Sequence, residues 1–310
     1  MLSNSWEKGR HNSNLRSNLF SGLARIFLDL SQFPLPMIGS LQVNNYGLLS
    51  LCNRPLSMEI QQLENEGIPT DMPRDFTYST VDSYIIDILG LHDNRFRYQP
   101  NAVNDVGDCA YQLSVLTAMR TIFQSIFSRT FRRGPYFLTF TDLHQSNIFV
   151  DPQWHITCIL DLEWMCALPM EMCGIPSWLT NKGVDQLDPT EYSAIREEFM
   201  QSLSNQEKGR PALPQIGNEG APPLRLSDVM NKSWESGAFW YALALSSPSG
   251  IFSIFSKHLR PLFCNAYEEE FETVMPFFFE KKVGCIAGRK LADKEEYDNN
   301  LRRAFELQPN

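Results

Sequence analysis

The feature that most constrains this chain is a polar loop between two short apolar segments, with a third short apolar segment directly after them. The segments Tyr136–Phe140, Ile148–Val150 and His155–Leu160 have the length and composition of short strands. The polar stretch Thr141–Asn147 separates the first two, and a tight turn at Asp151–Trp154 separates the second from the third. A chain that runs strand, loop, strand, turn and strand folds back on itself. We therefore expect the polar loop and the end of the third strand to meet at one edge.

Oxygen-bearing side chains gather at that edge. Asp142 and Asn147 lie in the loop, and Asp161 and Glu163 follow the third strand. Phosphoryl transfer needs a carboxylate that orients or deprotonates the attacking hydroxyl, and hard oxygen ligands that hold Mg²⁺ against the phosphates. Carboxylate and amide oxygens suit Mg²⁺, whereas thiols and imidazoles do not. This set of groups is therefore typical of phosphoryl transfer.

The spacing narrows the interpretation. Asp142 and Asn147 have the D-x-x-x-x-N interval of a kinase catalytic loop, and Asp161 follows Asn147 by fourteen residues, where a kinase has its metal-binding aspartate. The interval alone is common by chance, and Asp142 as a simple turn former is the competing interpretation. The flanking strand patterns, Asn-Ile-Phe-Val-Asp and Leu-Asp-Leu-Glu-Trp, favour the kinase-like one.

This segment resembles the aminoglycoside phosphotransferase group of the protein-kinase-like fold, especially its uncharacterised fungal members, with the pattern H-G-D-x-x-x-x-N-(I/L)-x-V-D and then I-(I/L)-D-x-E/D. The similarity extends from near Trp6 to the end and includes Asn53-Arg54-Pro55-Leu56. The resemblance implies transfer of phosphate from ATP to a small-molecule hydroxyl. It implies that Asp142 is the catalytic base, that Asn147 and Asp161 bind Mg²⁺ and thereby ATP, and that Glu163 assists the metal or supports the loop.

The chain departs from the family pattern in two ways. Phe140 and Thr141 stand where the family usually has His and Gly. The chain also contains no G-x-G, and its one lysine before Lys182 is Lys8, so the Gly-rich loop and strand lysine that grip ATP in kinases have no counterpart. We expect residues 1–310 to form one kinase-like C-terminal lobe with the N-terminal lobe absent. The favoured explanation is an incomplete gene product or fragment; the others are a degenerate pseudoenzyme and a lobe completed by a partner. A noncatalytic kinase-like binding module is the alternative function.

The predicted fold class is α+β, mainly helical, with small β-hairpins around the catalytic loop. A further hairpin is expected at 38–43 and 48–51, because Asn44–Gly47 suits a turn. Residues 53–80 are interpreted as a surface excursion, and residues 204–223, rich in Gly and Pro, as a flexible insertion. Apolar spacing predicts helices at 12–31, 81–91, 109–129, 190–203, 224–246, 250–259, 266–280 and 289–306.

Composition limits the partners and the compartment. The net charge of −9 gives no positive field for nucleic acid. No apolar run approaches the ~20 residues that cross a bilayer, and the N-terminus lacks the apolar core of a secretory signal. The seven cysteines form no C-x-x-C pair, so we interpret them as reduced thiols, mostly in the core, of a cytoplasmic protein. The acceptor substrate and the oligomeric state stay open.

Several side chains have two interpretations. His144 is a tempting acid–base group, but a hydrogen bond within the loop is the simpler role, and His155 is expected to be exposed and inert. The aromatic cluster Trp234–Tyr241 fits helix core better than a stacking platform for substrate. The acidic run Glu268–Glu270 fits a solvated helix face better than a site for a cationic substrate. Ser-His-Asp hydrolysis finds no support, because the chain lacks a G-x-S-x-G elbow.

Overall fold

The computed structural model describes residues 1–214, 223–264 and 270–306. Within these ranges the protein is α+β and mainly helical, with two small antiparallel sheets. The predicted class is therefore confirmed at this level. None of the helices in the described ranges combines the length and the apolar character that crossing a membrane requires.

The larger sheet has the strand order β2-β1-β6-β3 and the smaller one pairs β4 with β5. Their bounds are β1 Gly39–Val43, β2 Leu49–Asn53, β3 Tyr136–Phe140, β4 Ile148–Val150, β5 Ile156–Ile159 and β6 Met165–Pro169. The sequence analysis predicted all of these except β6. This strand lies between β1 and β3, and its buried side chains form a continuous apolar run without the alternation that identifies a half-exposed strand.

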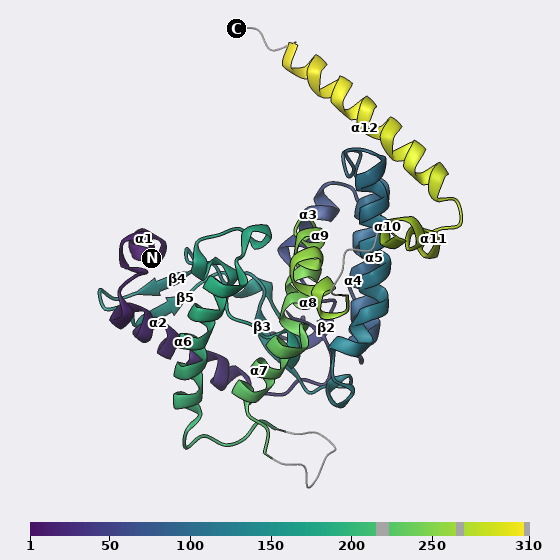
Figure 1. The fold of residues 1–310 in the computed structure, drawn as a ribbon. Coiled ribbons are helices and arrows are strands. Elements are labelled where there is room, and N and C mark those ends of the chain that lie inside the picture. The colour runs from purple at the N-terminus through teal and green to yellow at the C-terminus, as the bar shows by residue number, and fades with distance from the viewer. Residues whose placement is uncertain (215–222, 265–269, 307–310) are drawn as a thin grey trace.

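The helices surround the sheets in three groups (Figure 1). α2 packs along α6 near β4 and β5, α4 packs along α5 on the other side, and α7, α8 and α9 lie between them. The helix bounds are α1 Ser3–Gly9, α2 Ser13–Leu30, α3 Met58–Asn65, α4 Val81–Tyr98, α5 Val106–Ile126, α6 Pro189–Glu207, α7 Leu226–Ser236, α8 Ala238–Leu245, α9 Ile251–Ile254, α10 Glu270–Val274, α11 Pro276–Phe279 and α12 Val283–Glu306.

The long helices begin at side chains that cap them. Asn12 accepts hydrogen bonds from the backbone N–H groups at the start of α2, Thr80 does so for α4, and Asp105 for α5. Asp188 caps α6, and Pro189 follows at a position where a helix needs no N–H donor. These caps satisfy donors that have no partner within the helix, so the sequence fixes where each helix starts.

Several expected elements differ from the structure. The expected helix at 266–280 is two helices, α10 and α11, with residues 265–269 outside the described ranges, and the helix expected at 289–306 begins at Val283. The segment 53–80 is more than a surface excursion, because it contains α3 and buries Ile60 and Leu63. The expected helix at 224–246 is two helices, since Gly237 has a left-handed backbone with φ of 85°. Of the expected insertion at 204–223, the first residues belong to α6 and residues 215–222 lie outside the described ranges, as do Glu268 and Glu269 of the acidic run.

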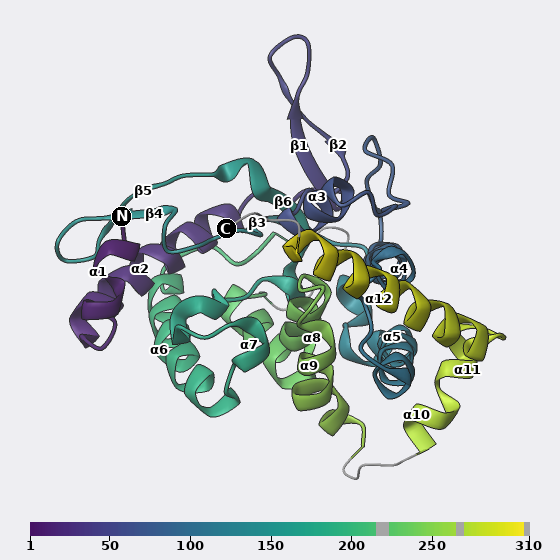
Figure 2. The same cartoon turned by 90° about the horizontal axis from the view of Figure 1, so that it is seen from above.

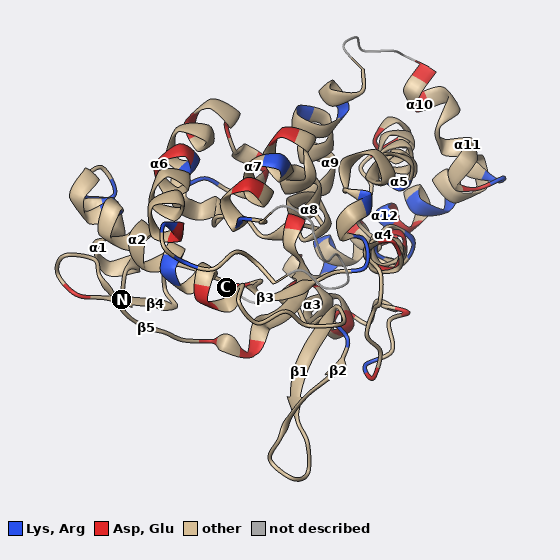
Figure 3. Cartoon of the chain, turned by 90° about the horizontal axis from the view of Figure 1, so that it is seen from below, with Lys and Arg blue, Asp and Glu red and all other residues tan. Residues whose placement is uncertain are grey.

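The β1–β2 hairpin projects from the body (Figure 2), and α12 starts beside α5 and α11 and extends away from the body (Figure 1). The hairpin residues 39–53 include no charged side chain, and Figure 3 shows this projection in tan throughout. The prediction that the cysteines lie mostly in the core is wrong. Cys52, Cys158 and Cys285 are exposed, while Cys109 and Cys166 are buried.

Candidate functional site

The polar loop lies at the junction of the two sheets because of how the strands pair. β3 and β6 pair so that Phe140, the last residue of β3, faces Met165, the first residue of β6. The loop 141–147 joins β3 to β4, and residues 160–164 join β5 to β6. Because β3 pairs with β6 and β4 pairs with β5, the two connections lie side by side.

Asn147 links the two connections. Its side-chain amide donates to the backbone oxygen of Asp142 at 3.3 Å, and its own backbone oxygen accepts from the N–H of Leu160 at 2.9 Å. The hydroxyl of Ser146 donates to Asn147 Oδ1 at 3.1 Å, which leaves one lone pair of that oxygen for another partner. Asn147 is buried, so this arrangement is held firmly by the loop itself.

Three more contacts hold the loop in position. The hydroxyl of Thr141 donates to the backbone oxygen of Trp164, which ties the loop to the start of β6. The indole N–H of Trp178 donates to the backbone oxygen of Leu143 at 2.5 Å. Phe140 stacks against Phe27 of α2 with ring centroids 6.3 Å apart. The two residues that depart from the family pattern, Phe140 and Thr141, thus each make a contact that supports the loop.

Asp142 is half-buried, and burial raises the pKa of its carboxyl above the ordinary value. His144 lowers this pKa, whereas the negative charges of Asp161 and Glu163 raise it further. Asp161 and Glu163 were expected near Asp142, and each affects the Asp142 carboxyl electrostatically; their shared site stays a prediction. A raised pKa suits a carboxylate that accepts a proton, because it brings basicity closer to the working pH.

Asp161 and Glu163 are exposed on the connection that follows β5. Asp161 has a left-handed backbone, with φ of 57°, and its side chain caps no N–H of the turn after it. Strained residues of this kind cluster at functional sites. The carboxylate is thus held in an unusual backbone position without serving a structural hydrogen bond there.

The predicted metal ligands form an incomplete set of donors. Among the residues in the described ranges, no three His, Cys, Asp or Glu side chains are grouped so that they could hold a metal ion by themselves. Asn147 was predicted to bind together with Asp161 and Glu163, and it is an amide. Mg²⁺ usually takes one or two carboxylates and fills its other positions with water and phosphate oxygens. The donor chemistry fits that pattern, and the metal-binding roles stay a prediction.

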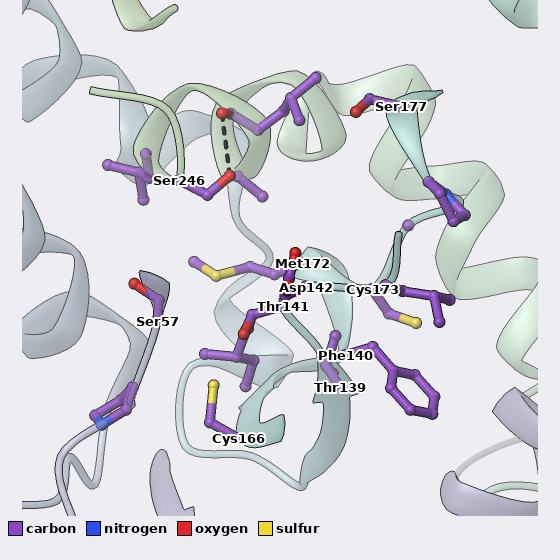
Figure 4. A pocket seen from close by; sticks show the side chains of 18 of the residues that line it. Ser57, Thr139, Phe140, Thr141, Asp142, Cys166, Met172, Cys173, Ser177 and Ser246 are labelled. Atoms are coloured by element: carbon purple, nitrogen blue, oxygen red, sulfur yellow. Dashed lines mark hydrogen bonds between the residues drawn. The ribbon is translucent and has the colours of Figure 1, made fainter. Parts of the chain in front are cut away.

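A cavity of about 380 Å³ opens beside Asp142 (Figure 4). In this view Asp142 and Met172 lie at the centre, with Ser57 on one side and Cys173 on the other. Its walls come from α2, the segment before and within α3, α4, β3 with the polar loop, β6, residues 172–178 and the α7–α8 pair. The sequence analysis did not find this cavity, because its lining is spread over segments that are far apart in the chain.

Glu59 is an acidic side chain of the cavity that the sequence analysis missed. It lies in the first turn of α3, where burial raises the pKa of its carboxyl, hydrogen bonds from its own N–H and from Ser57 lower it, and Asp142 raises it. One signal was available, namely the Asn-Arg-Pro-Leu segment just before it.

Arg54 gives that segment a structural role. Its side chain is only 2 % exposed, pairs with Glu64 at 2.7 Å, and donates to Thr70 at 3.1 Å and to the backbone oxygen of Met72 at 2.6 Å. These bonds fasten both ends of the 54–72 excursion to each other. The wall of the cavity that carries Glu59 is fixed by this buried arginine.

The histidines and the aromatic cluster behave largely as expected. His144 is exposed and its Nδ1 lies 2.9 Å from the Ser146 hydroxyl, so the predicted hydrogen bond within the loop is confirmed. His155 is exposed and contacts Asp151. In the aromatic cluster, Trp240 and Tyr241 are buried in the core, while Phe239 also lines the cavity.

Comparisons of the chain with models of protein families, with curated proteins and with solved structures found no match. The described residues define an α+β protein with a hydrogen-bonded polar loop, a cavity that this loop helps to line, and two exposed carboxylates on the connection after β5. Any assignment of function therefore depends on this loop, on the cavity and on the resemblance in sequence.

Proposed function

We propose that this chain is a kinase-like lobe that transfers a phosphoryl group from Mg·ATP to the hydroxyl of a small molecule. The observation that carries the proposal is the junction at which the Asn147 amide bonds to the backbone of Asp142 while Asp161 and Glu163 raise the Asp142 pKa. Phosphoryl transfer needs these groups side by side, since the protein contributes mainly positioning and electrostatic stabilisation.

The arrangement also separates the two sides of such a reaction. Asp142 lines the cavity, whereas Asn147, Asp161 and Glu163 do not. In the proposed site the acceptor hydroxyl enters from the cavity, and Asp142 accepts its proton. Asn147 and Asp161, with Glu163 beside them, hold Mg²⁺ on the other side; the ion neutralises phosphate charge when bound.

These residues provide only some of the groups that contact the phosphates of ATP in kinases. The 310 residues contain no G-x-G and no lysine between Lys8 and Lys182. We propose that the phosphates of ATP are also contacted by residues outside this segment. Each missing charge-assisted hydrogen bond is worth ~1.5–3 kcal/mol, so two of them weaken ATP binding or turnover of the 310-residue chain by about 100-fold or more.

The test is transfer of labelled γ-phosphate to a panel of alcohols at millimolar Mg·ATP. It is made on the 310-residue protein and on the product of the longest reading frame that contains it. Asp142→Asn keeps the shape of the side chain and removes the base, so turnover should fall about 10²- to 10⁴-fold. Asp151→Asn is the matched control, because Asp151 lies in the β4–β5 turn and bonds within that turn. Equal turnover in wild type and Asp142→Asn would contradict the assignment.

Asp161→Asn removes the negative charge of the side chain and keeps the backbone conformation. Asn tolerates the left-handed backbone nearly as well as Asp, so the variant should fold normally while losing a metal ligand. We expect the Mg²⁺ concentration for half-maximal turnover to rise at least tenfold. An unchanged Mg²⁺ dependence would remove Asp161 from the proposed metal site.

A noncatalytic kinase-like binding module is the second candidate, and the missing Gly-rich loop and strand lysine favour it. Titration of the 310-residue protein with Mg·ATP separates the two proposals. Micromolar binding that is weakened by Asp161→Asn would count against the noncatalytic module. A partner that binds at the polar loop and is insensitive to Mg·ATP would favour it.

A further inference from the structure

The polar side chains that line the cavity are largely used by the protein itself. Four hydroxyl groups donate their protons to backbone oxygens of the chain, and Figure 4 draws one of these bonds, that of Ser246. They belong to Ser31, Thr139, Thr141 and Ser246. Ser57 caps α3 with its side-chain oxygen. The hydrogen-bonding capacity left for a ligand therefore lies mainly at Asp142, Glu59 and Ser177, together with the imidazole of His144 and the hydroxyl of Tyr84.

Most of the remaining lining is apolar. Its large side chains come from several elements and include Phe27 of α2, Phe137 of β3 and Phe239 of α8. Cys166 and Cys173 also line it, and burial raises the pKa of both thiols to about 12, so they remain neutral and act as small apolar groups. Thus most of the surface that a bound molecule would touch favours hydrocarbon.

The charged side chains of the lining disfavour ionic ligands. Among the described residues that line the cavity there is no lysine or arginine, and only His144 can become positively charged. Asp142 and Glu59 are acidic and would repel a negatively charged acceptor. A cationic acceptor would have to leave water for an apolar wall.

The volume sets the size of the occupant. A water-sized group takes about 30 Å³ in a liquid, so a cavity of about 380 Å³ holds roughly a dozen such groups. A molecule with many hydroxyls would bury several of them without partners, at about 1–3 kcal/mol each. The cavity therefore suits a compact body with one polar end.

We infer that the acceptor is an uncharged hydrophobic alcohol of about a dozen non-hydrogen atoms, with its hydroxyl directed to Asp142, in place of a sugar or an aminoglycoside. This inference rests on the proposed function of Asp142. In the transfer step the hydroxyl oxygen forms a bond to the γ-phosphorus of ATP and its proton passes to the Asp142 carboxylate. The bond from the γ-phosphorus to the bridging oxygen breaks, and ADP leaves with that electron pair.

The experiment measures binding without any nucleotide, by calorimetric titration of the 310-residue protein with 1-butanol, 1-hexanol, 1-octanol, 1-decanol and 1-tetradecanol. Each buried methylene should tighten binding about fourfold, until the cavity is full near ten to twelve carbons. Glucose and kanamycin serve as polyhydroxylated probes, and decyltrimethylammonium as a cationic one. Affinity that does not depend on chain length, or tighter binding of any of these three than of decanol, would overturn the inference.

Two substitutions test whether the alcohols occupy this cavity. Ala242→Phe on α8 adds a ring to the wall, so the gain per methylene should stop about four to six carbons earlier. Ala194→Phe on the exposed side of α6 is the control, since it adds the same ring outside the cavity. If thermal unfolding shows that Ala242→Phe does not fold, Leu243→Ala enlarges the cavity instead and should move the limit to longer alcohols. A chain-length limit that neither cavity variant moves would refute binding at this cavity.

Failure of the inference can be told from failure of the proposed function. Binding of alkanols with the expected limit, together with transfer that is unaffected by Asp142→Asn, would keep the cavity assignment and reject the catalytic role. Transfer of phosphate to glucose or kanamycin that depends on Asp142, without binding of alkanols, would keep the function and reject the hydrophobic acceptor.

Discussion

Glu171 makes the stability of the cavity wall depend on pH. It lies in the 3₁₀ turn Met170–Met172, directly before the cavity residues Met172 and Cys173, and is 6 % exposed. One carboxyl oxygen accepts the backbone N–H of Ser128 at 2.9 Å, and the other has no hydrogen-bond partner among the described residues. Burial raises the pKa of this carboxyl from 4.5 to about 7, although the Ser128 bond and the charge of Arg132 lower it.

The sign and size of the effect follow from proton binding. Between pH 4.5 and about 7 the folded protein keeps a proton on Glu171 that the unfolded chain has released, so stability falls as the pH rises through this window. Each tenfold difference in proton affinity is worth about 1.4 kcal/mol, so the total loss is about 3 kcal/mol. Below pH 4.5 the contribution is fully present, and above about pH 8 none of it remains.

Other groups change the stability with pH in the opposite direction, so the assay must compare wild type with a Glu171 variant at each pH. Burial lowers the pKa of His92 and His258 to about 4, and these histidines add stability as the pH rises from about 4 to 6.5. Urea unfolding of wild type and Glu171→Gln at several values between pH 5 and 8.5 removes their contribution. We expect Glu171→Gln to gain about 3 kcal/mol relative to wild type across this range. A difference between the two proteins that is constant with pH would refute the reasoning.

Two further predictions concern stability, each measured by urea unfolding against a matched control. Arg54→Ala should lower the free energy of unfolding by about 3 kcal/mol or more, because it leaves buried partners of the arginine unpaired. Arg74→Ala should lower it by less than about 1 kcal/mol, since Arg74 pairs with the same Glu64 but is 77 % exposed. Equal losses in the two variants would contradict the role of burial. Gly237→Ala should cost more than about 1 kcal/mol, because its backbone is left-handed and the added Cβ would lie 2.5 Å from a leucine methyl group. Gly90→Ala in α4 has open space and should stabilise by about 0.5–1 kcal/mol, and a Gly237 variant as stable as wild type would refute the strain.

Connectivity made the loop predictable. Short strands on both sides of residues 141–147 can return to one another in few ways. The order of polar and apolar segments therefore predicted that the loop and the residues after β5 reach the paired ends of β3 and β6. The hydrogen bonds that fix Asn147 could not be derived in this way, because they depend on the rotamers of Ser146 and Asn147. The roles of these residues in phosphoryl transfer stay a prediction.

The cavity was beyond sequence reasoning for a different reason. A helix face can be recognised from spacing within a single segment, and Phe239 was correctly expected to pack inward. Nothing in that spacing says whether an inward side chain meets another side chain or an empty volume. That depends on how seven separate segments approach one another. A shift of one residue in a strand register would turn the side chains of that strand to the other face of the sheet.

The position of Glu59 opposite Asp142 depends on strand β6. β6 pairs with β3 along its whole length and with β1 at Gly39 and Ser40, so it joins the polar loop to the hairpin. The hydroxyl of Ser40 then accepts the backbone N–H of Leu56 at 2.9 Å, which brings the start of α3 to the same edge of the sheet. Gly39 allows this approach, because a Cβ there would lie 2.7 Å from the backbone oxygen of Asn53. Two strand pairings and one hydroxyl therefore bring a second carboxyl to the cavity, although more than eighty residues separate it from Asp142 in the chain.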